Sequence, residues 1–434
     1  MWDRPPGLSV LVAAALALAA FVAAPAPRGK VIQLPAGVVE VHAEMAIGSG
    51  TEVRGSARGT VLHAALDFSG RAILVVSGDG VLLRDFTVDG NRGALEIRAG
   101  LPPYDVPFAR FTRGNGVLAD GVRGLGIQNV RFREIPGFAI LVSRSRSVTL
   151  DRVQVDTSGS RNLAGRNNTT GGILLEEGTA DFRVTNCALR GIRGNGVWTH
   201  SLYTSPRNAR GQFLANRFAN IGRDALQVGH ATQVTVEGNG GVRIGYPQED
   251  VDVEGRAIPV AIDTAGNVDQ SSYARNRFSA IDGKCIDLDG FHDGEVRANV
   301  CTDVGAYGIV MNNTNPDMRS QNIRVEGNLL DGVKFGGVFV IGAGHVVARN
   351  RLLNLNTARC NEEAARSGCY YAPGEPGMLR SGIYLGQGAE RPAPARGNTI
   401  EDNEITGYQM SARCIGAAPA IDPAWNRVRN NRCR

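Results

Sequence analysis

The chain has few aromatic side chains, few histidines and no cysteine cluster. Aromatic residues make up 6% of its 434 positions, histidine occurs six times, and no CxxC pair or histidine-rich tract is present. Zinc modules and carriers of soft metals need closely spaced Cys and His ligands. We therefore predict no metal site and no required cofactor.

Dense positive charge and long helical periodicity are also missing. The formal net charge is only +5, arginine far outnumbers lysine, and no basic run is concentrated enough for a nucleic-acid surface. No segment after residue 30 shows the apolar spacing of a long α-helix, which disfavours helical folds. The predicted partner is not a nucleic acid, and the charge favours an acidic polymer only weakly.

One long apolar run is present, from Leu8 to Val22, and it follows Arg4. Its length is typical of the hydrophobic region of a signal peptide and short for a bilayer span, and small residues follow it. We expect residues 1–24 to be a signal peptide, with an uncleaved anchor as the alternative. The mature protein would then be secreted or periplasmic, with no membrane contact after cleavage.

Asparagine recurs at a nearly fixed interval. Asn276 and Asn299 are 23 positions apart, Asn328 and Asn350 are 22 apart, and an apolar or Arg-apolar pair follows each. A period of this size, made of short β-branched runs with Gly and Asn corners, is the mark of a solenoid. Stacked Asn side chains at a corner can hydrogen-bond to one another and to turn carbonyls. We therefore assign the asparagines a structural role.

Residues 31–37 (VIQLPAG), 46–55 (AIGSGTEVRG) and 81–91 (VLLRDFTVDGN) resemble coils of the pectate-lyase-like right-handed β-helices. The resemblance implies an all-β, single-stranded right-handed parallel β-helix over residues 25–434, interrupted by loop insertions. It specifies a fold and not a reaction.

The seven cysteines fit an exported protein, because oxidising compartments permit disulfides. Cys301 and Cys433 each stand two positions after a repeat Asn, and each has one cysteine shortly before it. This equal placement predicts bridges Cys285–Cys301 and Cys414–Cys433. Cys360 and Cys369 would close an insertion, which leaves Cys187 unpaired.

Strands that begin at a small residue place alternate side chains on opposite faces. If Ile262 and Ile286 point inward, the aspartates beside them point outward. Asp287 and Asp289 would then share a face about 7 Å apart, and Asp263 would lie about 4.8 Å from Asp287 on the adjoining coil. Crowded carboxylates raise at least one pKa, which leaves an acid beside an ionised partner. Glycosidic cleavage needs that pair.

This cluster is similar in arrangement to the three aspartates of polygalacturonase-type glycosidases, although that family's Asn-Thr-Asp, Gly-His-Gly and Arg-Ile-Lys signatures are absent. Residues 289–293 (DGFHD) resemble a loose form of the Asp-Pro-His-Asp motif of mannuronan C5-epimerases. The two resemblances imply a glycoside hydrolase or, alternatively, a lyase or epimerase on a uronate polymer, for which Ca²⁺ is a possible cofactor. The predicted catalytic residues are Asp263, Asp287, Asp289 and His292. Solvated aspartates or a structural Ca²⁺ site remain alternatives.

Other side chains of the same outward stripe, or of the insertions beside it, are candidates for binding sugar. Exposed aromatic rings are costly in water unless something covers them, so they either stack on sugar or lie under the insertions. The third functional alternative is a non-catalytic glycan-binding or surface protein. Oligomeric state is left open. The predicted substrate-binding residues are Trp198, His200, Gln227, His230, Lys284, Asn312, Asn313, Phe339, Arg380 and Tyr384.

Overall fold

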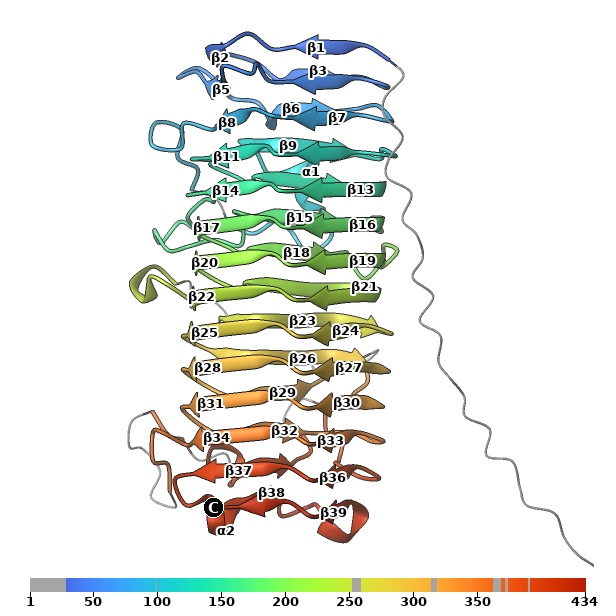
Figure 1. Ribbon diagram of the computed structural model, residues 1–434, viewed down its shortest axis with the longest axis vertical. Helices are drawn as coiled ribbons and strands as arrows, with labels where there is room; N and C mark the ends of the chain where they lie inside the picture. The colour runs from blue at the N-terminus through green and yellow to red at the C-terminus, as the bar shows by residue number, and fades with distance from the viewer. Residues whose placement is uncertain are drawn as a thin grey trace, which may run out of the picture.

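The computed structural model describes residues 29–98, 100–251, 259–313, 318–361, 368–370, 374–388 and 391–434. Figure 1 shows a single column of parallel coils that runs from β1 to β40. The predicted right-handed parallel β-helix is confirmed. The predicted signal peptide, residues 1–24, lies outside the described residues. None of the described helices is long and apolar enough to cross a membrane.

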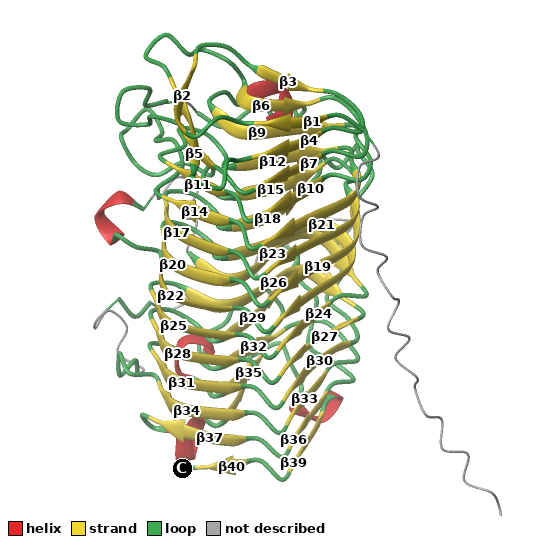
Figure 2. Ribbon diagram, turned by 45° about the horizontal axis from the view of Figure 1, so that its top comes forward, coloured by secondary structure: helices red, strands yellow, loops and turns green. Residues whose placement is uncertain are grey.

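Each coil contributes one strand to each of three faces, which Figure 2 shows as three sets of stacked arrows. The first face contains β3 (Met45–Ile47), β6 (Ala72–Val76), β9 (Asn115–Asp120), β12 (Ile140–Ser143), β15 (Ile173–Glu176), β18 (Val197–His200), β21 (Leu226–Glu237), β23 (Val260–Asp269), β26 (Lys284–His292), β29 (Ile309–Asn312), β32 (Val338–Val340), β35 (Ile383–Leu385) and β38 (Ile415–Ala417).

The second face shares the long strands β21, β23 and β26, whose last residues turn onto it. Its other strands are β1 (Val31–Gln33), β4 (Glu52–Arg54), β7 (Leu82–Arg84), β10 (Gly126–Gln128), β13 (Arg146–Asp151), β16 (Ala180–Thr185), β19 (Asn208–Leu214), β24 (Ser272–Ala274), β27 (Gly294–Arg297), β30 (Ile323–Glu326), β33 (Val346–Ala348), β36 (Thr399–Glu401) and β39 (Arg427–Arg429).

The third face is a separate sheet. It contains β2 (Gly37–Val41), β5 (Thr60–Ala64), β8 (Thr87–Asp89), β11 (Arg131–Arg133), β14 (Gln154–Asp156), β17 (Ala188–Ile192), β20 (Arg217–Ile221), β22 (Gly240–Ile244), β25 (Arg277–Ile281), β28 (Val300–Val304), β31 (Leu329–Val333), β34 (Arg351–Leu355), β37 (Glu404–Gly407) and β40 (Arg432–Cys433). The helical turns are α1 (Phe108–Phe111), α2 (Met410–Arg413), η1 (Gln248–Asp250), η3 (Met378–Arg380) and η4 (Pro423–Trp425).

The lumen of the column is filled by one apolar residue above another. On the first face, Ile262 pairs with Ile286, which pairs with Ile309, and all three side chains are at most 1% exposed. Each rung of such a column buries the surface of the next, so a coil depends on its two neighbours. The inward position of these isoleucines directs the neighbouring side chains outward.

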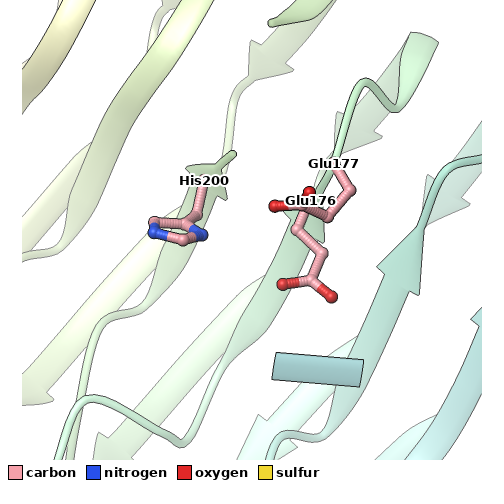
Figure 3. Close-up of side chains that lie close together, drawn as sticks. All are labelled: Glu176, Glu177 and His200. Atoms are coloured by element: carbon pink, nitrogen blue, oxygen red, sulfur yellow. The ribbon is translucent and has the colours of Figure 1, made fainter. Parts of the chain in front are cut away.

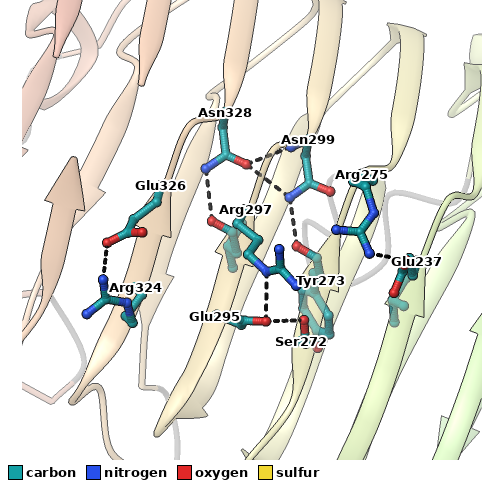
Figure 4. Close-up of polar contacts among 12 residues, drawn as sticks. Glu237, Ser272, Tyr273, Arg275, Glu295, Arg297, Asn299, Arg324, Glu326 and Asn328 are labelled. Atoms are coloured by element: carbon teal, nitrogen blue, oxygen red, sulfur yellow. Dashed lines mark hydrogen bonds and ion pairs between the residues drawn. The ribbon is translucent and has the colours of Figure 1, made fainter. Parts of the chain in front are cut away.

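A ladder of asparagines runs along the corner before the third face. Each amide nitrogen donates to the Oδ1 atom of the next asparagine, as Asn299 does to Asn328 at 3.0 Å, and to a carbonyl such as Tyr273 O at 2.8 Å (Figure 4). The predicted structural role of the asparagines is confirmed. The ladder consists of Asn216, Asn239, Asn276, Asn299, Asn328, Asn350, Asn403 and Asn431.

Cys187 occupies the rung before the first amide of this ladder. Its backbone N–H donates to Asn216 Oδ1 at 3.0 Å, and its thiol is fully buried against carbonyl oxygens. It is a free cysteine, as predicted. The bridges Cys285–Cys301, Cys360–Cys369 and Cys414–Cys433 are present and confirm the predicted pairing.

Candidate functional site

The predicted outward carboxylates lie where the parallel register brings three coils together on the first face. Asp263 pairs with Asp287 across β23 and β26, and Gln227 of β21 pairs with Asp263. Because Ile262 and Ile286 fill the lumen, both carboxyl groups are on the outer surface of the sheet. The sequence prediction for this pair of aspartates is confirmed at the level of geometry.

Hydrogen bonds hold the Asp263 carboxylate in place. Gln227 Nε2 donates to Asp263 Oδ2 at 2.6 Å, and Asn195 Nδ2 donates to Gln227 Oε1 at 2.7 Å. The chain of amides begins in the turn before β18 and ends on the carboxylate two coils later. It orients Asp263 through side chains that carry no charge.

Asp224, in the turn before β21, is a third member of the cluster and was missed in the sequence. Its Oδ1 atom accepts from Val260 N at 2.8 Å, and its side chain is 7% exposed. It stands two positions before Leu226, as Lys284 stands two positions before Ile286. Alignment of the coils on these inward residues would have revealed it as a neighbour of Asp263.

Lys284 supplies the positive charge of the cluster. Its ammonium group contacts Asp287 Oδ2, and both side chains are largely buried. The other Asp287 oxygen, Oδ1, is buried and has no hydrogen-bond partner among the described residues. A buried carboxylate oxygen without a donor is costly and calls for an explanation.

Burial and mutual repulsion separate the protonation states of these groups. Burial, with the charges of Asp224 and Asp287, raises the pKa of Asp263 well above its usual range. Burial also raises the pKa of Asp224 to about 6, against the opposing charge of Arg223. Burial opposes the Lys284 ammonium, but Asp287 and Asp263 outweigh it and raise the pKa of Lys284. An aspartate with a raised pKa therefore adjoins an ion pair.

Asp289 and Asn312 form the next outward row. Asp289 is opposite Ala265 on one side and Asn312 on the other, so it does not pair directly with Asp263. Both side chains are partly exposed, whereas Asn313 is 8% exposed and its backbone N–H donates to Asn312 Oδ1. Asp289 and Asn312 border the aspartate cluster.

His292 is not brought into the cluster. The strand turns at Gly290, whose φ of 80° favours glycine, and His292 then pairs with Asp269 beyond the turn. Its ring nitrogens contact Asp293 Oδ2 at 2.7 Å and Asn267 Oδ1 at 3.0 Å. The turn at Gly290 therefore separates His292 from the pair Asp263 and Asp287.

Of the two alternatives for the predicted aromatic residues, cover by other side chains is the one found at all three positions. Trp198 is 7% exposed because Phe108 of α1 packs on it with ring centroids 5.1 Å apart. At the other end, Phe339 and Tyr384 stack on each other at 6.0 Å and are 7% and 1% exposed. These rings support the insertions in this structure and are not open platforms.

The remaining predicted binding residues lie at the two ends of the aspartate cluster. His200 is edge-on to Phe108, His230 contacts the ring of Tyr203, and Arg380 ends η3 beside Tyr384. The partly exposed stretch between the two covered ends contains Gln227, Asp263, Asp289 and Asn312. We call this stretch, with Asp224, Lys284 and Asp287, the acidic segment.

Comparison with known proteins supports the fold assignment. No family model matches the chain, and no curated protein matches it. Among solved structures, PfbA, a surface adhesin of Streptococcus pneumoniae, aligns with 77% of this chain and 86% of its own, at 15% identity and a TM-score of 0.57. The catalytic domain of a GH87 α-1,3-glucanase in complex with nigerose aligns with 93% of this chain and 64% of its own, at 12% identity and a TM-score of 0.51. At these identities the likeness is one of fold.

Proposed function

We propose that this chain is an exported carbohydrate-active enzyme that hydrolyses glycosidic bonds of a polysaccharide at the acidic segment. The observation that carries the proposal is the direct pairing of Asp263, whose pKa is raised, with Asp287, which is ion-paired to Lys284. Hydrolysis needs one carboxyl group that donates a proton and a second that is ionised. The raised pKa of Asp263 and the ion pair of Asp287 support this division of roles.

Asp263 is the general acid in this proposal. Burial and the nearby charges of Asp224 and Asp287 keep a proton on its carboxyl, and the Gln227 amide fixes its orientation. It would protonate the oxygen of the leaving sugar. Asp287 would act on water or on the anomeric carbon through Oδ1, since Oδ2 contacts Lys284.

Lys284 makes this division of roles possible. Without its charge, three carboxylates on adjoining coils would all favour their protonated forms, because like charges disfavour one another's ionisation. The ammonium contacts Asp287 and not Asp263. It therefore determines which aspartate of the pair is the base.

The lyase or epimerase hypothesis has less support, because His292, the centre of the motif behind it, lies beyond the turn at Gly290. A binding protein without catalysis is the other outcome that the fold allows, since a surface adhesin shares the architecture. Hydrolysis, elimination and binding without cleavage give different readouts, so one assay separates these alternatives.

The test is a screen of the purified mature chain against neutral and uronic polysaccharides. The panel includes α-1,3-glucan, because a glucanase of this linkage has the same fold. New reducing ends without ultraviolet absorbance support hydrolysis, unsaturated products support a lyase, and binding without cleavage supports an adhesin-like role. Each of these three outcomes corresponds to a different class of protein.

Substitution then tests the assigned residues. Asp263→Asn and Asp287→Asn should each lower kcat at least about 100-fold, the usual contribution of a general acid or base. Asp303→Asn, an exposed position on β28 of the same coil as Asp287, is the matched control and should retain activity. Activity of Asp287→Asn within tenfold of the parent would refute the assignment.

A further inference from the structure

A second cluster of polar side chains lies beside α1, at the ends of β15 and β18. Glu176 pairs with His200 across these strands, and Glu177 follows Glu176 directly. One ligand atom from each of the three residues lies within 4.8 Å of the others. Figure 3 shows the three side chains together.

Two adjacent glutamates reach the same place because the backbone leaves the strand there. Consecutive side chains of a regular strand point to opposite faces. Glu177 instead has a φ of 56°, in the left-handed region, and its side chain turns toward the side that Glu176 occupies. His200 approaches from the next coil.

The two carboxylates are buried without a balancing cation. Glu176 is 0% exposed, and its oxygens accept from the backbone N–H groups of Phe108 and Ala109 at 3.0 and 2.9 Å. Glu177 is 5% exposed and accepts from Leu202 N at 2.9 Å. Within the described part of the chain, no lysine or arginine forms an ion pair with either. Buried carboxylates without a balancing cation are costly, so the site favours a bound positive charge.

The histidine beside them has a ring nitrogen without a partner. His200 Nδ1 is buried and has no hydrogen-bond partner among the described residues, and the same is true of His230 Nδ1 on the following coil. Buried polar atoms without partners call for an explanation.

We propose that Glu176, Glu177 and His200 bind one divalent transition-metal ion of the Zn²⁺ class, with His230 as a neighbouring donor. Such an ion would neutralise the carboxylates and use the imidazole nitrogen at once. An imidazole with carboxylates suits zinc, whereas Ca²⁺ and Mg²⁺ select oxygen ligands alone. Zinc bonds of about 2.0–2.2 Å place tetrahedral ligand atoms about 3.3 Å apart, which small side-chain rotations can reach from the observed spacing.

The position of the site indicates a structural role. His200 is two coils before Asp263, about 10 Å along the column, so the ion would not touch the acidic segment. Glu176 holds the start of α1 through two N–H groups and would join that segment to the ion. The ion would fasten the insertion that covers Trp198.

The absence of a sequence motif explains why composition argued against a metal. The ligands come from two coils and include residues that adjoin each other in the chain, so no CxxC or His-x-x-His spacing marks them. The metal titration described next tests the sequence prediction of no metal site.

The experiment uses the full mature chain, stripped with a chelator and then titrated with Zn²⁺ or Co²⁺. We expect one equivalent of Zn²⁺, a higher melting temperature when loaded, and Co²⁺ absorption bands typical of low coordination number. X-ray absorption at the zinc edge should show nitrogen and oxygen neighbours with an imidazole signature and no sulfur. Failure of the wild-type chain to retain one equivalent would overturn the proposal.

Two variants locate the ion. Glu177→Gln keeps an acceptor for Leu202 N, and His200→Gln keeps a polar side chain; each should weaken binding at least about tenfold. His42→Gln, an exposed histidine near the start of the column, is the control and should bind as the parent does. Unchanged affinity in both site variants would place the ion elsewhere and contradict the proposal, and the spectra of the wild-type protein decide the case if a variant fails to fold.

Discussion

Asp263 lies opposite Asp287 in the ladder between β23 and β26, yet it is Asp287 whose carboxylate forms an ion pair with Lys284 on the same surface. Two chemically identical side chains on neighbouring rungs therefore have different surroundings. One has an amide and the charge of other carboxylates near it, and the other has an ammonium group. Such a difference is what distinguishes an acid from a base in a carboxylate pair.

Lys284→Met should destabilise the fold and abolish activity. The substitution leaves Asp287 buried without its cation, which typically costs about 3–5 kcal/mol in unfolding free energy. Denaturant unfolding monitored by circular dichroism measures the loss. Lys334→Met, at the turn after β31, is the control and should change stability by less than about 1 kcal/mol.

Addition of Asp287→Leu to Lys284→Met should restore most of the lost stability, because no unpaired charge is then buried. The double variant should remain inactive. Additive losses in the double variant would mean that Lys284 and Asp287 do not interact energetically.

Ionisation of Asp224 should lower the free energy of unfolding as the pH rises. Its folded pKa of about 6 exceeds its unfolded value of 3.8, so the folded chain binds the proton more tightly. The stability that it contributes is complete below about pH 4 and is lost as the pH rises through 6, by about 3 kcal/mol. Melting temperatures between pH 4 and 8 should show this decline.

Asp224→Asn should flatten that decline while it lowers activity. The amide keeps the acceptor for Val260 N and cannot ionise. Some slope should persist, because the raised pKa of Asp263 acts in the same direction. A pH profile identical to that of the parent would show that Asp224 does not titrate in this range.

Asn299→Ala should cost about 3 kcal/mol of stability. The change leaves the backbone N–H of Asn276 and the carbonyl of Tyr273 without their side-chain partner inside the column, and each buried unsatisfied group costs about 1–3 kcal/mol. Asn354→Gly on the third face removes an exposed contact with Asp331, tolerates the left-handed backbone at this position (φ 49°) and serves as the control. Equal melting temperatures for the two variants would contradict the structural role of the ladder.

Thiol labelling should distinguish Cys187 from the six bridged cysteines. Burial raises the pKa of its thiol to about 12, so an alkylating reagent should not label the native chain. Denaturation without reductant should expose one thiol, and denaturation with reductant should expose seven. Mass spectrometry reads each state directly. Rapid native labelling at Cys187 would show that the corner opens.

The features that follow the coil period could be predicted from sequence. The inward isoleucines, the outward Asp263 and Asp287, the asparagine corner and the paired cysteines all recur at matching positions. Register follows from such recurrence, because a slip by one residue would turn every apolar side chain outward.

The features that depend on turns and insertions could not be predicted. His292 leaves the cluster at a glycine turn, and Glu177 joins Glu176 through a left-handed backbone. The cover over Trp198 comes from α1, a helical turn that interrupts the repeat of strands. Loop conformations carry no periodic signal, and Glu177 lies away from the residue before each ladder asparagine, where a positive φ recurs from coil to coil.

The asparagine ladder makes the coils between Asn216 and Asn431 interchangeable in one respect. Every amide offers the same donor to the following rung and the same acceptor to the preceding one. Duplication of a whole coil from this region would leave the hydrogen-bonded chain continuous. A coil from before Cys187 would interrupt the ladder, because Val153 occupies the corresponding place there and has no side-chain amide that could donate to the next coil. Insertion or deletion of whole coils is therefore easiest in the half of the column that contains the acidic segment.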